Sequence, residues 1–382
     1  MSKDHSSQPL IEDDEVCNHS GNRPFGEVLQ ANMSRRSLLG GSLAVGATGF
    51  FGSSFTKLAQ AQEMPRIGFT PVPLADGGGT EPAISEDYEW QVLIPWGEPL
   101  DPDGPEFSYP PTAAEQARQI GIGHDGMWYF PIDDSDFGGG LLEPEDAGFW
   151  RVVLQRWSQQ NSRGLLCINH EFGTNPHVLG KEAPESLADV RTSQHAHGMS
   201  VVAIREFQGT WSTVESNFSR RIHVNTPVMF SGPVAGHPLL DTPNGNIPLG
   251  TVNNCGNGYT PWGTYLTCEE NFNGYFGATN NEATWTPTAE QERYGFSENG
   301  FGYGWHLFDR RFDLSDPDYV NEENRFGWIV EVDPKDPASR PVKRTALGRC
   351  KHEGIAIVIG RGGRAVGYMG DDQRFDYIYK FV

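Results

Sequence analysis

One stretch of the sequence gathers side chains that could bind metal ions. Residues 253–276 read NNCGNGYTPWGTYLTCEENFNGYF and combine the thiol of Cys255 with two adjacent carboxylates, Glu269 and Glu270. A thiolate beside hard carboxylate oxygens suits iron, manganese or zinc, whereas further carboxylates and Asn carbonyl groups suit calcium. An isolated cysteine is more often a small buried apolar residue, and paired glutamates are more often solvated. This stretch alone therefore favours a metal site and an ordinary structural role about equally.

The composition of the stretch predicts how it is built. Glycines and a proline break regular structure at its start, which places Cys255 on a loop. Residues 262–268 have the aromatic and β-branched composition of a strand. Because neighbouring side chains of a strand point to opposite faces, only one of Glu269 and Glu270 can easily face Cys255. Cys268 and Glu270 would share one face of the strand and Glu269 the other, and the strand pattern leaves open which glutamate faces Cys255.

Other candidate ligands stand at the ends of other predicted strands. Asn169 and Glu171 follow a buried strand, Glu353 precedes one, and Asp372 ends another. Each alone is more often a turn residue or a solvated carboxylate. The inner ends of propeller blades converge on one channel, so these side chains could meet there with Cys255. The candidate metal ligands are therefore Cys255, Glu270, Glu353, Asp372, Glu269, Glu171 and Asn169.

The composition predicts a mostly β protein. Gly 46 and Pro 27 among 382 residues, with 12% aromatic residues, indicate many short strands joined by turns. Residues 183–196 form the one convincing helical stretch. Short strands recurring in units of a blade's length predict a β-propeller of antiparallel strands with few helices. The net charge of −21 opposes binding to phosphate backbones, so we expect no nucleic-acid partner.

The N-terminal segment predicts export. Arg35 and Arg36 open a weakly hydrophobic run, and Ala59 and Ala61 supply the small residues of a cleavage site. This pattern is typical of a twin-arginine signal, so the expected partner is the twin-arginine translocase and the expected location is periplasmic or secreted. The run is too short and Gly-rich for a stable membrane span. We expect a signal peptide at 1–61, a Pro/Gly-rich lead-in at 62–112 and the propeller at 113–382.

Several motifs together resemble one family. They are the twin-arginine signal, CINHE at 167–171, HGMSVV at 197–202, SGPVAGH at 231–237, the long motif from residue 253, HEG at 352–354 and YMGDD at 368–372. They are similar to the PhoX-type alkaline phosphatases over essentially the whole exported part.

The resemblance implies a β-propeller and a phosphomonoesterase that acts on extracytoplasmic phosphate esters with a cluster of Fe³⁺ and Ca²⁺. It implies that Cys255 is an iron ligand and that Glu270, Glu353 and Asp372 ligate metal, with Glu269 as the fallback for Glu270. Cys255, Glu270 and Glu353 would then carry the catalysis. We expect a monomer.

The sequence also departs from this family. The resemblance implies longer relatives that carry further ligands and a phosphate-contacting arginine in an Arg-Pro-Glu motif, and that motif does not occur here. Residues 375–382 form an apolar strand, so we expect the chain to be cut off inside a blade. On that basis the 382-residue chain should bind metal weakly and hydrolyse phosphate monoesters poorly.

Two other function classes stay open at this point. A calcium-dependent propeller hydrolase of another ester class, such as a lactonase, would use the carboxylates without Cys255. A non-catalytic propeller would present only a binding surface. Beyond the signal, four cysteines could form disulfides in an oxidising compartment, or could be three buried thiols and one metal ligand.

Overall fold

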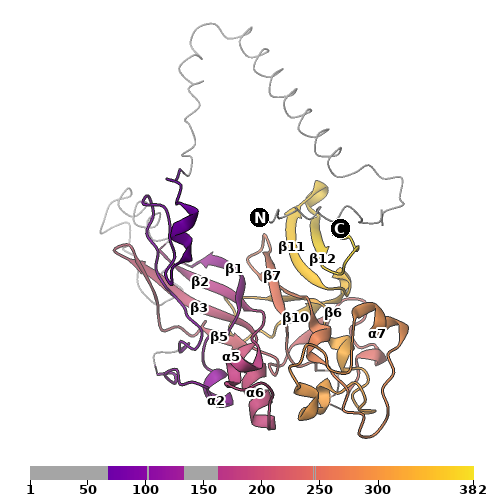
Figure 1. Cartoon of the computed structure of the whole chain (residues 1–382). Coiled ribbons are helices and arrows are strands. Elements are labelled where there is room, and N and C mark those ends of the chain that lie inside the picture. The colour runs from indigo at the N-terminus through magenta and orange to yellow at the C-terminus, as the bar shows by residue number, and fades with distance from the viewer. Residues whose placement is uncertain (1–67, 101–102, 133–161, 244, 246) are drawn as a thin grey trace, which may run out of the picture. The chain divides into compact units, whose positions relative to one another are not determined.

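The computed structural model describes residues 68–100, 103–132, 162–243, 245 and 247–382 (Figure 1). Residues up to Trp90 form a unit separate from residues 91–382, and each unit is described by itself. The described part of the first unit contains one short 3-10 helix, η1 (Leu74–Gly78). The predicted signal residues Arg35, Arg36, Ala59 and Ala61 lie outside the described residues.

The first sheet is built from consecutive antiparallel strands (Figure 1). Its order is β1-β2-β3-β4, and a short fifth strand, β5, also pairs with β3. The strands are β1 (His124–Pro131), β2 (Arg163–His170), β3 (Gly198–Phe207), β4 (Thr210–Thr213) and β5 (Arg220–Ile222). β2 and β3 are buried over most of their length, which fits their nearly continuous apolar sequences.

The second sheet contains the stretch with Cys255. Its order is β6-β10-β9-β8-β7, and β6 pairs with β10 in parallel while the other pairs are antiparallel. Its strands are β6 (Met229–Ser231), β7 (Asn254–Tyr259), β8 (Tyr265–Glu269), β9 (Ile329–Val332) and β10 (Val342–Arg344). The parallel pair is an exception to the predicted antiparallel pattern, because the chain makes a long excursion between these two strands.

The third sheet is a meander of β11 (His352–Ile359), β12 (Ala365–Asp371) and β13 (Ile378–Phe381). Its first strand packs closely against β7. A Cβ atom added to Gly256 would lie 2.1 Å from the Glu353 carbonyl oxygen, and one added to Gly258 would lie 2.3 Å from the Ile355 carbonyl oxygen. Only glycine leaves room for this approach of two backbones. The two glycines of β7 therefore bring Cys255 beside the start of β11.

The described helices are short. The α-helices are α2 (Ala113–Gln116), α5 (Asn175–Leu179), α6 (Leu187–Ala196) and α7 (Ala289–Tyr294). Among the described residues of 91–382, the connections also contain six 3-10 helices: η3 (Pro238–Leu240), η4 (Phe272–Tyr275), η5 (Trp305–Leu307), η6 (Arg310–Phe312), η7 (Glu322–Arg325) and η8 (Thr345–Leu347). A seventh, η9 (Arg361–Gly363), is irregular. The helix predicted at 183–196 begins only at Leu187, because the Ser186 side chain accepts a hydrogen bond from the Asp189 backbone N–H. The other three described α-helices were not indicated by the sequence, because helices of four to six residues are too short to show helical periodicity.

A mostly β structure with few helices confirms the predicted class. No helix in the described part of the chain has the length and apolar character needed to cross a membrane. The largest buried cluster is aromatic and surrounds η4, with Phe272, Tyr275, Phe276, Trp305 and Phe312 at its centre. Among the described residues, four cysteines are present, and all four are buried free thiols.

Candidate metal centre

Cys255 lies in strand β7, so the predicted loop was wrong. The pairing of β7 with β8 slips by one residue between Asn254 and Asn257, which makes a β-bulge at Cys255 and Gly256. A bulge changes the direction of local side chains, and here the Cys255 side chain is 9% exposed. The glycines of this stretch serve close packing against β11 instead of a turn.

Asn169 fixes the bulge. Its Nδ2 group donates to the carbonyl oxygens of Cys255 at 2.5 Å and Gly256 at 3.0 Å. Its Oδ1 atom accepts a hydrogen bond from the Tyr265 hydroxyl at 3.1 Å. With both ends of its amide engaged and no exposed surface, Asn169 holds Cys255 in position, and its predicted role as a metal ligand stays a prediction.

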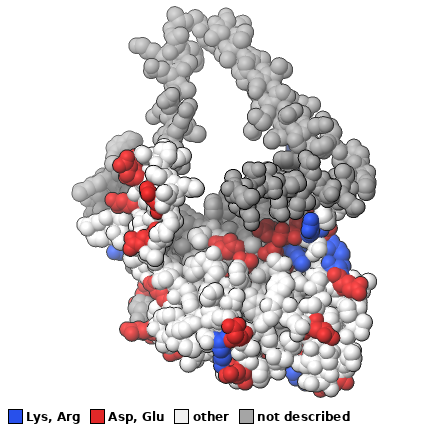
Figure 2. Space-filling view, viewed as in Figure 1, with Lys and Arg blue, Asp and Glu red and all other residues white. Residues whose placement is uncertain are grey.

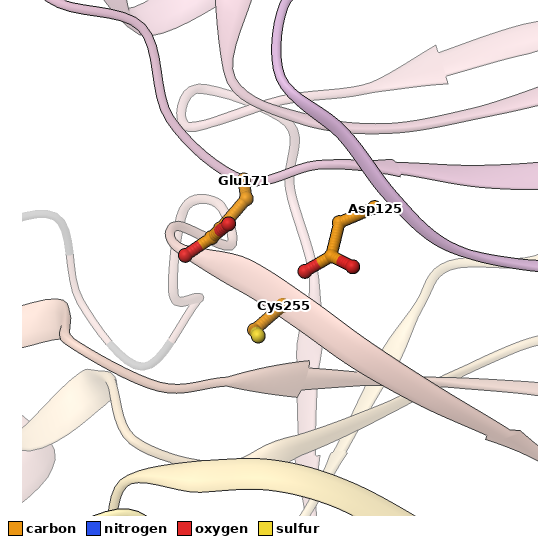
Figure 3. Close-up of side chains that lie close together, drawn as sticks. All are labelled: Asp125, Glu171 and Cys255. Atoms are coloured by element: carbon orange, nitrogen blue, oxygen red, sulfur yellow. The ribbon is translucent and has the colours of Figure 1, made fainter. Parts of the chain in front are cut away.

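Asp125, Glu171 and Cys255 form a first candidate ligand group. One ligand atom from each lies within 4.8 Å of the other two, and Figure 3 shows the two carboxylates directed toward the thiol. His124 lies opposite His170 in the β1–β2 pair, so Asp125 and Glu171 come from the same end of these strands. The end of the first sheet therefore meets the bulge of the second.

Cys255, Glu270 and Glu353 form a second group under the same distance limit. The Cys255 Sγ atom lies 3.6 Å from the Glu353 Oε1 atom. Glu270 directly follows β8, and its backbone N–H donates to the Asn253 carbonyl oxygen at 3.0 Å. Glu353 lies where the β11–β12 pairing shifts between His352 and Gly354. Because Cys255 belongs to both groups, the two are one continuous cluster.

The electrostatics of the cluster show crowded negative charge. Burial raises the pKa of Glu171 to about 7, and the charges of Asp125 and Glu353 add to the shift. Burial is the main cause that raises the pKa of Glu270 to about 8, and a hydrogen bond with Asp372 and the charge of Glu353 raise it further. Burial also raises the pKa of the Cys255 thiol. A bound cation would reverse these effects by favouring the charged forms.

Glu269 serves a different purpose from its neighbour. Its side chain is fully buried and accepts hydrogen bonds from the Lys343 Nζ at 2.7 Å and from the backbone N–H groups of Gly327 and Trp328, both at 3.0 Å. It points away from Cys255, as strand alternation requires. The geometry thus brings Glu270 to the candidate centre and leaves Glu269 in a structural ion pair.

Asp372 and Lys351 lie at the edge of the cluster. Asp372 hydrogen-bonds to Glu270, and its backbone N–H donates to the Lys351 carbonyl oxygen at 3.0 Å. Burial lowers the pKa of the Lys351 amine, and the charges of Glu270, Asp371 and Asp372 oppose this shift. Asp372 is therefore placed beside the centre, next to a cation that can meet an anionic ligand.

Comparison with known proteins assigns the chain to a family. The model of the family described as alkaline phosphatase PhoX matches residues 68–382. The chain belongs to the PhoX alkaline phosphatase family. No curated protein matches it.

A solved PhoX structure is similar to this chain. It is described as Pseudomonas fluorescens PhoX in complex with vanadate, a transition state analogue, and it is 42% identical with a TM-score of 0.68. The match covers 78% of this chain and 48% of the solved chain, so this chain spans about half of that protein's length. The similarity confirms the prediction of a PhoX-type propeller fold. PhoX enzymes are metal-dependent and extracytoplasmic.

The residues present fit metal ions of the PhoX kind. Cys255 offers one soft sulfur ligand, and four carboxylates surround it, which is a donor set for a trivalent or divalent transition metal together with calcium. The raised pKa values of Glu171 and Glu270 show that the cluster is under-neutralised without cations. Buried carboxylates of this density need a positive partner.

Asp125 belongs to the first candidate ligand group, and the sequence did not reveal it as a candidate. The sequence shows only an Asp ahead of an aromatic strand, which is an ordinary turn signal. Its approach to Cys255 depends on the packing of β1 against β7, where a Cβ atom on Gly126 would lie 2.8 Å from the Cys255 carbonyl oxygen. A glycine directly after Asp125 was the one local hint of this contact.

Proposed function

We propose that this protein hydrolyses phosphate monoesters outside the cytoplasm, at a centre that holds Fe³⁺ and Ca²⁺. The catalytic ligands are Cys255, Glu270 and Glu353, to which Asp125 and Glu171 are added. Export by the twin-arginine translocase, directed by Arg35 and Arg36, is part of the proposal. Cleavage near Ala61 would release the mature chain.

One observation carries this proposal. A single buried thiol belongs to two carboxylate groups at once, and these groups come from three sheets that meet at one place. The relative at 42% identity was solved with vanadate, described as a transition state analogue. Vanadate takes the shape of a phosphoryl group during transfer, so its binding to the relative supports a phosphoryl-transfer centre in this chain.

The residues of the chain have distinct tasks in this chemistry. Bound cations of this type polarise phosphate oxygens and neutralise charge that develops in the transition state. Cys255 must lose its proton to act as a ligand, and Glu171 and Glu270 must be charged. Asn169 keeps Cys255 in place through the two carbonyl groups of the bulge. Lys351 adds a positive charge at the edge, where a phosphate ester can approach.

The test is phosphate release from p-nitrophenyl phosphate by the protein loaded with Fe³⁺ and Ca²⁺. We expect turnover that a chelator abolishes and that Cys255→Ala lowers by at least about 10³-fold, the scale of losing a group that stabilises transition-state charge.

The matched control is Cys350→Ala, which removes another buried free thiol outside both ligand groups. It should keep activity and metal content. Unchanged turnover in Cys255→Ala, or cleavage of lactones in place of phosphate esters, would contradict the proposal and favour the calcium-dependent hydrolase.

A further inference from the structure

A pocket of about 500 Å³ opens next to Glu171. Its walls include Phe172, which directly follows Glu171 in the chain, and Phe301 and Tyr303 from the segment before η5. None of the described residues that line it belongs to the candidate ligand groups. The pocket is therefore a neighbour of the metal centre and not part of it.

Packed aromatic rings connect the pocket to the centre. Tyr303 stacks on Tyr275 with ring centroids 4.4 Å apart and an interplanar angle of 11°. The Tyr275 hydroxyl donates to the Glu171 carbonyl oxygen at 3.1 Å. The negative charge of Glu171 also contributes, after burial, to the raised pKa of Tyr303. A molecule in the pocket would thus lie beside the Glu171 side of the centre.

Two phenylalanines present apolar surface in this pocket. Phe172 is 50% exposed and Phe301 is 60% exposed. The Phe301 backbone N–H donates to the Gly274 carbonyl oxygen at 2.7 Å, and its ring covers Gly274 so closely that a Cβ atom there would lie 2.1 Å from the ring. Single exposed apolar residues are common, but two aromatic rings in one pocket beside a catalytic centre indicate a contact surface.

Polar side chains also line the pocket. The Asn175 side chain is 4% exposed, and its Nδ2 group donates to the carbonyl oxygens of Gly302 and Tyr303, both at 3.2 Å. Its Oδ1 atom has no hydrogen-bond partner among the described residues. Glu182 adds an exposed carboxylate, and no Lys or Arg is found among the described lining residues. The described lining therefore favours a neutral aromatic ring over an anionic group.

We infer that this pocket binds the leaving group of the phosphate ester and selects esters of aromatic rings, aryl and nucleoside monophosphates, over small aliphatic ones. The inference rests on the proposed function, because it takes the phosphoryl group to lie at the Cys255 cluster. The rings of Phe172 and Phe301 contact the aromatic leaving group. These residues determine specificity and leave the chemical step unchanged.

The test compares binding of phenylphosphonate and methylphosphonate to the metal-loaded protein by calorimetry. Their carbon–phosphorus bonds are not hydrolysed, so binding is measured apart from turnover. We expect phenylphosphonate to bind at least about tenfold more tightly than methylphosphonate. Phe172→Ala and Phe301→Ala should each weaken the binding of phenylphosphonate by about threefold to tenfold. Methylphosphonate affinity should stay the same in both variants.

Phe207→Ala is the matched control, because Phe207 is 61% exposed and lies at the end of β3 opposite the end that pairs with His170. It should change neither affinity. Equal binding of the two phosphonates to the unmodified protein would overturn the inference and leave the proposed function intact. Binding of neither phosphonate would overturn the proposed function and the inference with it.

Kinetics give a second measurement. In Phe172→Ala the KM for adenosine monophosphate should rise about fivefold or more while kcat stays within twofold, and both constants for glycerol phosphate should be unchanged. A loss of kcat on both substrates would show that Phe172 supports the fold of the centre, which contradicts a role in specificity.

Discussion

Glu269 and Glu270 are adjacent in the sequence, but one has a structural role and the other lies at the candidate metal centre. Glu269 is fully buried in an ion pair with Lys343, whereas Glu270 faces a cluster of other acids. Burial raises the pKa of both, but Lys343 opposes the shift at Glu269, whereas Asp372 and Glu353 add to the shift at Glu270. The two side chains have the same chemistry and opposite electrostatic surroundings.

Replacement of these glutamates should therefore give opposite results. Glu269→Gln leaves the buried Lys343 without its counter-charge and should lower the free energy of unfolding by about 3–5 kcal/mol. Glu270→Gln removes a repelled charge, so the chelated protein should be as stable as before or more stable, while metal affinity falls. Urea unfolding with chelator and metal content by elemental analysis measure the two effects. Metal loss in Glu269→Gln without destabilisation would reverse the assignment.

At the scale of elements, the sequence predicted strands better than their irregularities. The buried strand expected next to Asn169 is β2, the strand expected next to Glu353 is β11, and the strand expected before Asp372 is β12. Apolar runs between turn residues were enough for these. The bulge at Cys255 could not be predicted, because it depends on the register with β8 and on Asn169 from a different sheet. Asp125 was missed for the same reason as the bulge, because its approach to Cys255 also depends on contacts between different sheets.

The close approach of β7 and β11 gives a prediction at this scale. Gly256→Ala places a methyl group against the Glu353 carbonyl oxygen, so the strands must separate, at a cost of about 1–3 kcal/mol in unfolding free energy. Separation also draws Glu353 away from Cys255, so metal content should fall.

Gly354→Ala is the matched control on the facing strand, because a Cβ atom there would meet nothing within 4 Å. Its unfolding midpoint and metal content should match those of the unmodified protein. If both alanine variants behave alike in thermal unfolding, the steric argument for Gly256 is wrong.

At the scale of the whole molecule, the acidic charge seen on the surface contrasts with a buried arginine in the first sheet, Arg221. Figure 2 shows that Asp and Glu are more widely spread than Lys and Arg over the face in view. Inside, Arg221 donates to the carbonyl oxygens of His195 at 2.8 Å and His197 at 2.9 Å. Burial lowers the pKa of Arg221 to about 9. The neighbouring histidines are therefore held neutral.

These histidines predict acid sensitivity. Burial lowers the pKa of His197 to about 4, and burial, His195 and Arg221 lower the pKa of His223 to about 2, both from 6.5. As pH falls below about 6.5, these histidines take up protons in the unfolded chain but stay neutral in the folded one, so their contribution to the free energy of unfolding should fall toward pH 4. The raised pKa values of Glu171 and Glu270 act in the opposite direction in the chelated protein, so the effect is read as the difference between the unmodified protein and the histidine variant. Urea unfolding from pH 8 to pH 5 measures this, and His223→Asn should flatten the curve. His177→Asn, at an exposed position, should leave it unchanged.

The cluster around Cys255 draws on β1, β2, β7, β8 and β11, so its ligands span the chain from residue 125 to residue 353. The ligands of this centre are far apart in the sequence, so the centre can form only after all three sheets have packed together. Cations bound there act as a reversible crosslink among distant segments, and their binding energy becomes folding energy. Metal occupancy should therefore report completed folding, and an exchange rate of the ions would measure how often the three sheets come apart.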